Sequence, residues 1–164
     1  SEELYGKRVE ALKFFSQYNE VDLYGGRWEN ASLFIKKIWH GFAGDKPKTM
    51  SDYKFALCFE NAIWPGYVTE KIFDCFLVGT IPVYWGAPDV EEYIPTDCFI
   101  DIRKFIKNGE KNYEELRQFL HALTPDQINK YREAIRVFFA SESFKKFTPE
   151  HFVETMLKII HGNY

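Results

Sequence analysis

The sequence has few cysteines and no excess of positive charge. Its 164 residues include three cysteines, Cys58, Cys75 and Cys98, and carry a formal net charge of −3. A chain with net negative charge lacks the electrostatic footprint by which proteins bind nucleic acid, so we expect no nucleic-acid partner. Because no two cysteines form a C-x-x-C pair, we predict buried free thiols instead of disulfides or a zinc site.

Motifs for metals, phosphate loops and membranes are also missing. The histidines have no H-x-x-x-H spacing, and no G-x-G-x-x-G or G-x-x-x-x-G-K-[ST] motif occurs, so we expect no metal and no dinucleotide site of these types. No run approaches the roughly 20 apolar residues of a membrane span. No signal peptide opens the chain, and its abrupt start predicts a fragment boundary. Any anionic ligand would therefore be held by a few cations and backbone N–H groups.

Aromatic side chains, by contrast, are abundant. Phe, Tyr and Trp make up 18% of the chain, within an otherwise ordinary composition of 46% hydrophobic and 27% charged residues. Most rings are expected in the core, although some could line a pocket for a flat base or a sugar face. The length predicts one domain, residues 1–164.

The middle of the chain alternates strand and helix patterns. Residues 53–59, 81–85 and 98–102 read as strands, and the first is apolar on both faces. Between the first two strands, Thr69 is a predicted N-cap for a helix that Gly79 ends. We therefore predict an α/β fold with a Rossmann-like parallel sheet flanked by helices.

The flanking segments are predicted to be mainly helical. Residues 4–18 have helical spacing and precede a short predicted strand at 21–24, which Gly25 and Gly26 end. Further helices are expected at 89–93, at 113–122, after Thr124 with its capping box, and after Thr148.

Ligands of doubly wound sheets bind beyond the carboxyl ends of the strands, where two loops qualify. One is the Gly25–Gly26 turn, and the other, residues 60–67, leads into a helix N-terminus that favours a phosphate. Lys71 opposes the dipole of that helix at a cost of up to about 1 kcal/mol, which a bound diphosphate would offset. From the position alone, a solvated surface lysine is an equally good interpretation.

Other side chains around the second loop have both structural and functional interpretations. Asn61 and Tyr67 offer directional hydrogen bonds, but loop residues of these types are commonly turn formers. Glu70 suits the helix dipole as a first-turn acid. Trp64 could cover the core, contact a further domain or stack on a ligand.

Residues 53–86 read YKFALCFENAIWPGYVTEKIFDCFLVGTIPVYWG. This resembles the signature of the α-1,3/4-fucosyltransferases: a strand ending in F-E-N, a variable loop, Y-[VI]-T-E-K, a helix and an I-P-[VI]-Y-W-G-like strand. The resemblance covers residues 5–105, including an arginine-bearing helix upstream. It implies the donor-binding half of a two-domain GT-B-type glycosyltransferase that binds GDP-fucose without a metal.

The resemblance also implies roles for individual residues. Asn61 and Tyr67 correspond to contacts with the donor, and Glu70 to a hydrogen-bonding partner near the reacting sugar. Lys71 and Arg8 correspond to the two cations that neutralise the diphosphate, a role that suits the planar fork of arginine.

The implied reaction is an inverting transfer of L-fucose to O3 or O4 of an N-acetylglucosamine or glucose unit in a glycan acceptor. Such a reaction needs a base, which in that family is a carboxylate of the N-terminal half. Nothing in this chain corresponds to it, and neither Glu60 nor Glu70 is assigned to the role. We expect a chain that binds donor but does not turn over alone, with exposed apolar surface around Trp64 and Gly25.

Two alternatives stay open: a glycosyltransferase half that uses another nucleotide sugar, and a non-catalytic interaction module on the same fold. Free thiols and the missing signal peptide favour a bacterial enzyme in the cytoplasm or at the membrane periphery over one in the Golgi lumen.

Overall fold

The computed structural model describes residues 2–26, 28–29, 31–107 and 109–161. At its centre lies a parallel sheet with the strand order β2 (Phe55–Phe59), β4 (Ile81–Trp85), β5 (Ile100–Asp101). Strands β2 and β4 pair along their full length, from Phe55 opposite Ile81 to Phe59 opposite Trp85. The predicted Rossmann-like sheet is thereby confirmed.

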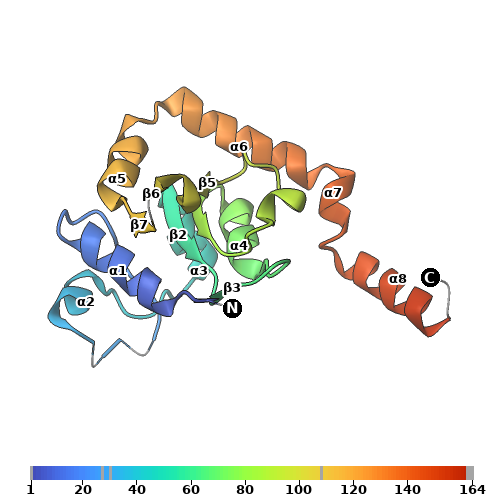
Figure 1. The fold of residues 1–164 in the computed structure, drawn as a ribbon, viewed down its shortest axis with the longest axis horizontal. Helices are drawn as coiled ribbons and strands as arrows, with labels where there is room; N and C mark the ends of the chain where they lie inside the picture. The colour runs from blue at the N-terminus through green and yellow to red at the C-terminus, as the bar shows by residue number, and fades with distance from the viewer. Residues whose placement is uncertain (1, 27, 30, 108, 162–164) are drawn as a thin grey trace.

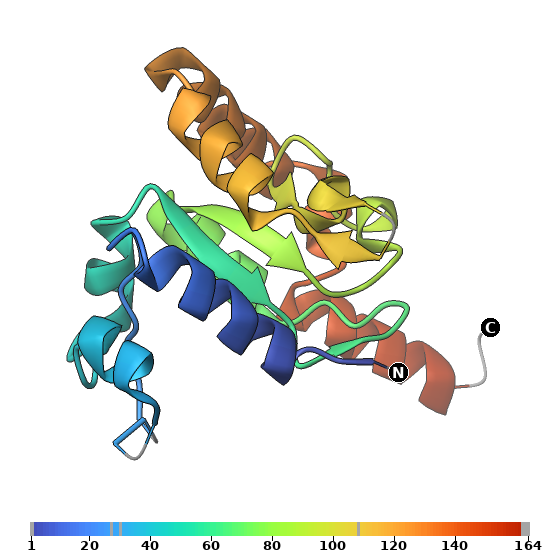
Figure 2. The same cartoon turned by 60° about the vertical axis from the view of Figure 1, so that its left-hand side comes forward.

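Helices cover both faces of this sheet. The four that pack against it are α1 (Tyr5–Ser16), α4 (Glu70–Val78), α5 (Tyr113–Ala122) and α6 (Pro125–Phe139). One face, with Phe59 and Val83, packs against Phe15 of α1 and Leu116 of α5. Figure 2, in which this face comes forward, shows β2 between α1 and α5. The opposite face packs against α4 and the second half of α6.

Helix α4 forms where its capping residues predict it. The Thr69 side chain accepts a hydrogen bond from the Lys71 amide at the N-terminus. At the other end, Gly79 adopts a left-handed conformation with φ of 74°, which glycine reaches without steric cost. The capping box of Thr124 and Gln127 at the start of α6 is likewise present.

Three predicted elements differ in the structure. Residues 21–24 form no strand beyond a single parallel bridge between Leu23 and Trp39. The strand predicted at 98–102 is shorter, because Asp101 caps the 3-10 helix η2 (Ile102–Phe105) by accepting from the Arg103 amide. The loop after β2 includes the short strand β3 (Ala62–Ile63), which pairs with β1 (Glu2–Glu3).

The remaining elements lie around this centre. They are α2 (Leu33–Ile38), α3 (Lys46–Ser51), the 3-10 helix η1 (Val90–Glu92), the hairpin of β6 (Ile106–Lys107) and β7 (Glu110–Lys111), α7 (Glu142–Lys145) and α8 (Pro149–Ile160). Helix α8, red in Figure 1, extends away from the sheet. None of the helices within the described ranges has the length and apolar character to cross a membrane.

The three cysteines are buried and free, as predicted. Cys58 lies on β2 and Cys75 on α4, and both belong to the core between sheet and helix. Burial raises the pKa of the Cys98 thiol to about 12, so that this side chain stays protonated at neutral pH.

Candidate functional site

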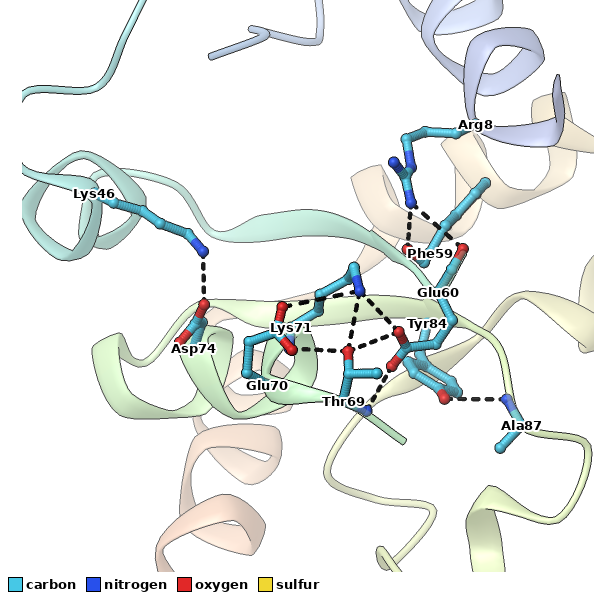
Figure 3. A network of polar contacts seen from close by, with 10 residues as sticks. All are labelled: Arg8, Lys46, Phe59, Glu60, Thr69, Glu70, Lys71, Asp74, Tyr84 and Ala87. Atoms are coloured by element: carbon cyan, nitrogen blue, oxygen red, sulfur yellow. Dashed lines mark hydrogen bonds and ion pairs between the residues drawn. The ribbon is translucent and has the colours of Figure 1, made fainter. Parts of the chain in front are cut away.

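A buried carboxylate marks the carboxyl end of the central strands. Glu60 directly follows β2 and its side chain has no solvent exposure. It accepts hydrogen bonds from the Thr69 amide at 2.9 Å, the Thr69 hydroxyl at 2.7 Å and the Lys71 ammonium at 3.0 Å. A buried carboxylate is tolerated when its oxygens are paired in this way, so Glu60 joins the end of β2 to the start of α4 (Figure 3).

Gly86 leaves the space that the Glu60 side chain occupies. A Cβ at position 86 would lie 2.4 Å from Cγ of Glu60 and 2.4 Å from the hydroxyl oxygen of Tyr84. That hydroxyl accepts a hydrogen bond from the Ala87 amide at 3.1 Å, and burial raises the pKa of Tyr84. The position that follows β4 therefore has no room for a side chain while Glu60 keeps this place.

The structure explains the position of Lys71 in the first turn of α4. Its ammonium lies 3.0 Å from Oε2 of Glu60, 3.0 Å from the Thr69 hydroxyl and 3.9 Å from Oε1 of Glu70. The Glu60 carboxylate thus offsets the unfavourable interaction of this cation with the helix dipole. From the sequence we considered a bound diphosphate or solvent for this purpose, and the structure adds a third partner within the chain, the Glu60 carboxylate.

Arg8 reaches the same junction from α1. Its Nη2 atom donates to the Phe59 carbonyl at 2.7 Å and to the Glu60 carbonyl at 3.4 Å. Arg8 and Lys71 therefore both contact Glu60, one at its backbone and the other at its side chain (Figure 3). The two predicted cations are 63 positions apart in the sequence. In the structure both lie at the carboxyl end of β2.

The other predicted site residues lie at the surface around this junction. Asn61 is exposed, and its carbonyl accepts from the Leu4 amide at 2.9 Å, which ties the loop to the start of α1. Tyr67 is 37% exposed and Glu70 also faces solvent. Of these side chains, Glu70 lies 3.9 Å from the Lys71 ammonium, and the roles of all three toward a donor stay predictions.

Large apolar side chains are exposed around Trp64 and Gly25, the two places where we predicted apolar surface. Trp64 in the loop after β2 is 57% exposed, and Phe42, whose ring lies against Gly26, is 78% exposed. Gly25 itself is partly accessible. The loop that carries Trp64 is held by the Gly66 amide, which donates to the Asp89 carboxylate at 2.9 Å.

Sequence reasoning missed the central positions of Glu60 and Gly86. A signal for Glu60 was present, because an acidic residue directly after a strand buried on both faces requires hydrogen-bond donors close by. Gly86 carried no comparable signal, since its requirement comes from Glu60, a residue far away in the sequence.

The arrangement suits an anionic ligand. Two cations and the N-terminus of α4, with its backbone N–H groups, lie at the carboxyl end of a parallel sheet. The described part of the chain brings no three His, Cys, Asp or Glu side chains together as a possible metal site.

The chain is similar to known proteins over most of its length. A family model described as glycosyltransferase family 10 (fucosyltransferase), C-terminal, matches residues 2–155. An alpha-(1,3)-fucosyltransferase of Helicobacter pylori is 34% identical over 133 residues, which cover 73% of this chain and 26% of that protein. A GDP-fucose protein O-fucosyltransferase 3 of Xenopus laevis is 32% identical over 128 residues, which cover 71% of this chain and 27% of that protein.

Solved structures show the same similarity in three dimensions. The crystal structure of an alpha1,3-fucosyltransferase with GDP-fucose matches with a TM-score of 0.58 at 30% identity, over 79% of this chain and 34% of that one. A structure of an alpha1,3-fucosyltransferase with GDP matches with a TM-score of 0.54 at 31% identity. The chain therefore spans about a third or less of the length of these relatives.

Proposed function

Because this chain belongs to glycosyltransferase family 10, the fucosyltransferases, and matches its C-terminal domain, we propose that it is the donor-binding half of an inverting fucosyltransferase that uses GDP-fucose. The observation that carries this proposal is the junction at Glu60. There Arg8 from α1 and Lys71 from α4 are held together at the carboxyl end of β2. Two fixed cations at a helix N-terminus provide a site for a nucleoside diphosphate.

Arg8 and Lys71 would act on the leaving group. Breaking the bond between fucose and phosphate places negative charge on GDP, and cations fixed in advance stabilise that charge in the transition state. An ammonium has three N–H donors and a guanidinium five, so each side chain can hold Glu60 or its backbone and still donate to a phosphate oxygen. Glu60 acts as a positioning residue, because its carboxylate keeps Lys71 in place.

The remaining predicted residues would contact the sugar nucleotide from the surface loop. Asn61 and Tyr67 provide hydrogen-bonding groups on either side of the loop after β2. Glu70 lies next to Lys71, where a carboxylate near the sugar would stabilise the positive charge that develops on the fucose ring.

We propose that the acceptor is O3 or O4 of an N-acetylglucosamine or glucose unit. The names of the Helicobacter pylori relative and of the solved structures support an α-1,3 linkage. The Xenopus laevis relative is named a protein O-fucosyltransferase, which makes a protein acceptor the second candidate. The base and the acceptor site would come from the part of the enzyme outside this chain, so we expect the chain to bind donor without turnover.

Calorimetric titration with GDP and GDP-fucose tests the donor site. UDP and a UDP-sugar, which carry uracil in place of guanine, are the control ligands. We expect Lys71→Ala to weaken GDP binding more than about tenfold, which corresponds to about 1.4 kcal/mol. Lys46→Ala is the matched control, because Lys46 also pairs with a carboxylate of α4, Asp74 at 2.6 Å, but away from the helix N-terminus.

Equal losses in the two variants would show that Lys71 acts only through the general charge or stability of α4. Tighter binding of UDP than of GDP would favour a different nucleotide sugar. Failure of both nucleotides to bind at millimolar concentration would favour the interaction module. The acceptor is tested with a complete enzyme that contains this domain, which should fucosylate N-acetyllactosamine. If that enzyme fucosylated a folded protein domain and not N-acetyllactosamine, a protein acceptor would be favoured.

A further inference from the structure

The loop between β2 and α4 contains a tight turn at residues 64–67. The Tyr67 amide donates to the Trp64 carbonyl at 3.1 Å, and Gly66 has a φ of 72°. With Pro65 at the second position and a glycine of positive φ at the third, this is the arrangement of a type II β-turn. The bond that closes the turn does not use the Gly66 amide, so this amide can donate to an acceptor outside the turn.

The acceptor is Asp89, in the segment that follows β4. The Gly66 amide lies 2.9 Å from Oδ1 and 3.1 Å from Oδ2 of Asp89. Asp89 is at the N-cap position of η1, where an aspartate normally accepts from an amide of its own helix. The structure describes all of residues 89–93, and the Asp89 carboxylate caps none of their amides. The side chain that would cap η1 therefore holds the turn at 64–67 instead.

The segment that carries Asp89 is itself fixed from the neighbouring strand. Arg103 of η2, which follows β5, donates from Nη1 to the Pro88 carbonyl and from Nη2 to the Glu91 carboxylate at 2.8 Å. Its Nε donates to the Asp101 carboxylate at 2.9 Å, and this bond holds the guanidinium in place. In the chain, Asp89 lies between the two residues that Arg103 binds. The Asp89 carboxylate therefore has a defined position beyond the carboxyl end of β4.

Tyr67 lies between two backbone positions that carboxylates hold. On one side, the Gly66 amide donates to Asp89. On the other, the Thr69 amide donates to Glu60 at 2.9 Å. The backbone on both sides of Tyr67 is thereby attached to the segments that follow β2 and β4. A loop that is ordered before its ligand arrives loses less conformational entropy on binding, which raises the affinity.

We propose that Asp89 is a positioning residue for the nucleotide sugar. Through Gly66 it fixes the turn, so that the Tyr67 side chain, which is 37% exposed, is in place before the donor binds. This inference rests on the proposed function, in which Tyr67 contacts the donor. Asp89 acts through the backbone of the turn and not by contact with the ligand. Without its carboxylate the turn would sample further conformations, and donor binding would have to order it.

Amide hydrogen exchange, measured by NMR without ligand, tests whether Asp89 holds the turn. We expect Asp89→Ala to speed exchange at Gly66 by more than roughly tenfold. Asp89→Asn keeps an acceptor oxygen at the same place and should restore most of the protection. The Ile81 amide, which donates to the Lys54 carbonyl at 2.9 Å, is the internal reference for global unfolding. Glu92→Ala, which removes an exposed acid of the same 3-10 helix, is the matched control.

Calorimetric titration of the same proteins with GDP-fucose tests the link to donor binding. Asp89→Ala should weaken binding about threefold to tenfold, the range expected for one hydrogen bond that orders a loop, and Asp89→Asn should recover most of the loss. Glu92→Ala should bind like the parent. Because Asp89 acts through Tyr67, the Asp89→Ala substitution in a Tyr67→Ala protein should change the affinity by less than about twofold.

Unchanged exchange at Gly66 in Asp89→Ala would overturn the proposal. Faster exchange with unchanged affinity for GDP-fucose would also overturn it, as would a loss in the Tyr67→Ala protein as large as in the parent. The parent protein tests the proposed function separately. If the parent does not bind GDP-fucose, the proposed function is contradicted, and the exchange measurement alone decides whether Asp89 fixes the turn.

Discussion

Helices α4 and α8 begin alike but differ in their surroundings. Each follows a threonine N-cap, Thr69 or Thr148, and each has an apolar face. Helix α4 buries Ile72, Cys75 and Phe76 against the sheet. Helix α8, in contrast, exposes the large apolar side chains of Phe152, Val153, Met156, Leu157, Ile159 and Ile160.

This difference shows that the signals that form a helix are not the ones that form the candidate site. Caps and periodicity are local and are present in both segments. Only α4 has the sheet on one side and the buried Glu60 at its N-terminus, and only there does a surface-type side chain, Lys71, take a defined position. Burial against other elements therefore distinguishes the candidate site, and four comparisons between substituted proteins measure the size of this difference.

The largest effect is expected at Glu60. Glu60→Ala leaves the amide and hydroxyl of Thr69 without their acceptor and removes the partner of Lys71, so we expect the free energy of unfolding to fall by about 3 kcal/mol. Urea denaturation measures this loss. Glu154→Ala on exposed α8 is the control and should change stability by less than about 0.5 kcal/mol. Similar values for the two variants would contradict the central role of Glu60.

The next effect is expected at Gly86. In Gly86→Ala the added methyl group would overlap Glu60 and Tyr84, so we expect a loss of about 2 kcal/mol and weaker packing of the Glu60 side chain. Gly44→Ala is the matched control, because a Cβ there meets nothing within 4 Å. Thermal unfolding of both proteins provides the comparison, and a Gly86→Ala protein as stable as the parent would show that the junction has room to adjust.

The two helix caps give a direct comparison of α4 with α8. Both Thr69→Ala and Thr148→Ala remove a capping oxygen. Thr69 also donates to Glu60 and accepts from the Lys71 ammonium, so its replacement should cost about 1 kcal/mol more than that of Thr148. Chemical denaturation resolves a difference of this size. Equal losses would mean that the Glu60 network adds nothing to an ordinary cap.

The smallest effect is expected on α8. Phe152 and Ile160 are 64% and 69% exposed, so Phe152→Lys and Ile160→Lys should each change the free energy of unfolding by less than about 0.5 kcal/mol. The matched core substitution, Ile72→Ala on α4, should cost about 2–5 kcal/mol. A loss above about 1 kcal/mol at Phe152 would show that α8 is packed in solution and that the contrast between the two helices is smaller than the structure indicates.

Much of the fold follows from local patterns. The strands β2 and β4 were predicted from continuous apolar runs, and α4 from Thr69 and Gly79, because each signal lies within the element that it specifies. The strand predicted at 21–24 was wrong beyond one bridge, since a strand needs a neighbour and the adjacent position is a cavity.

The site shows the same division. The sequence alone determined the parallel α/β core, the family, and the choice of Arg8 and Lys71 as candidate cations. Only the tertiary structure decided that these two meet at Glu60, that Glu60 offsets the position of Lys71 on the helix dipole, and that Gly86 must be small. The reason is that helix caps and apolar periods act within a few residues, whereas a buried carboxylate takes its partners from whichever segments the fold brings around it.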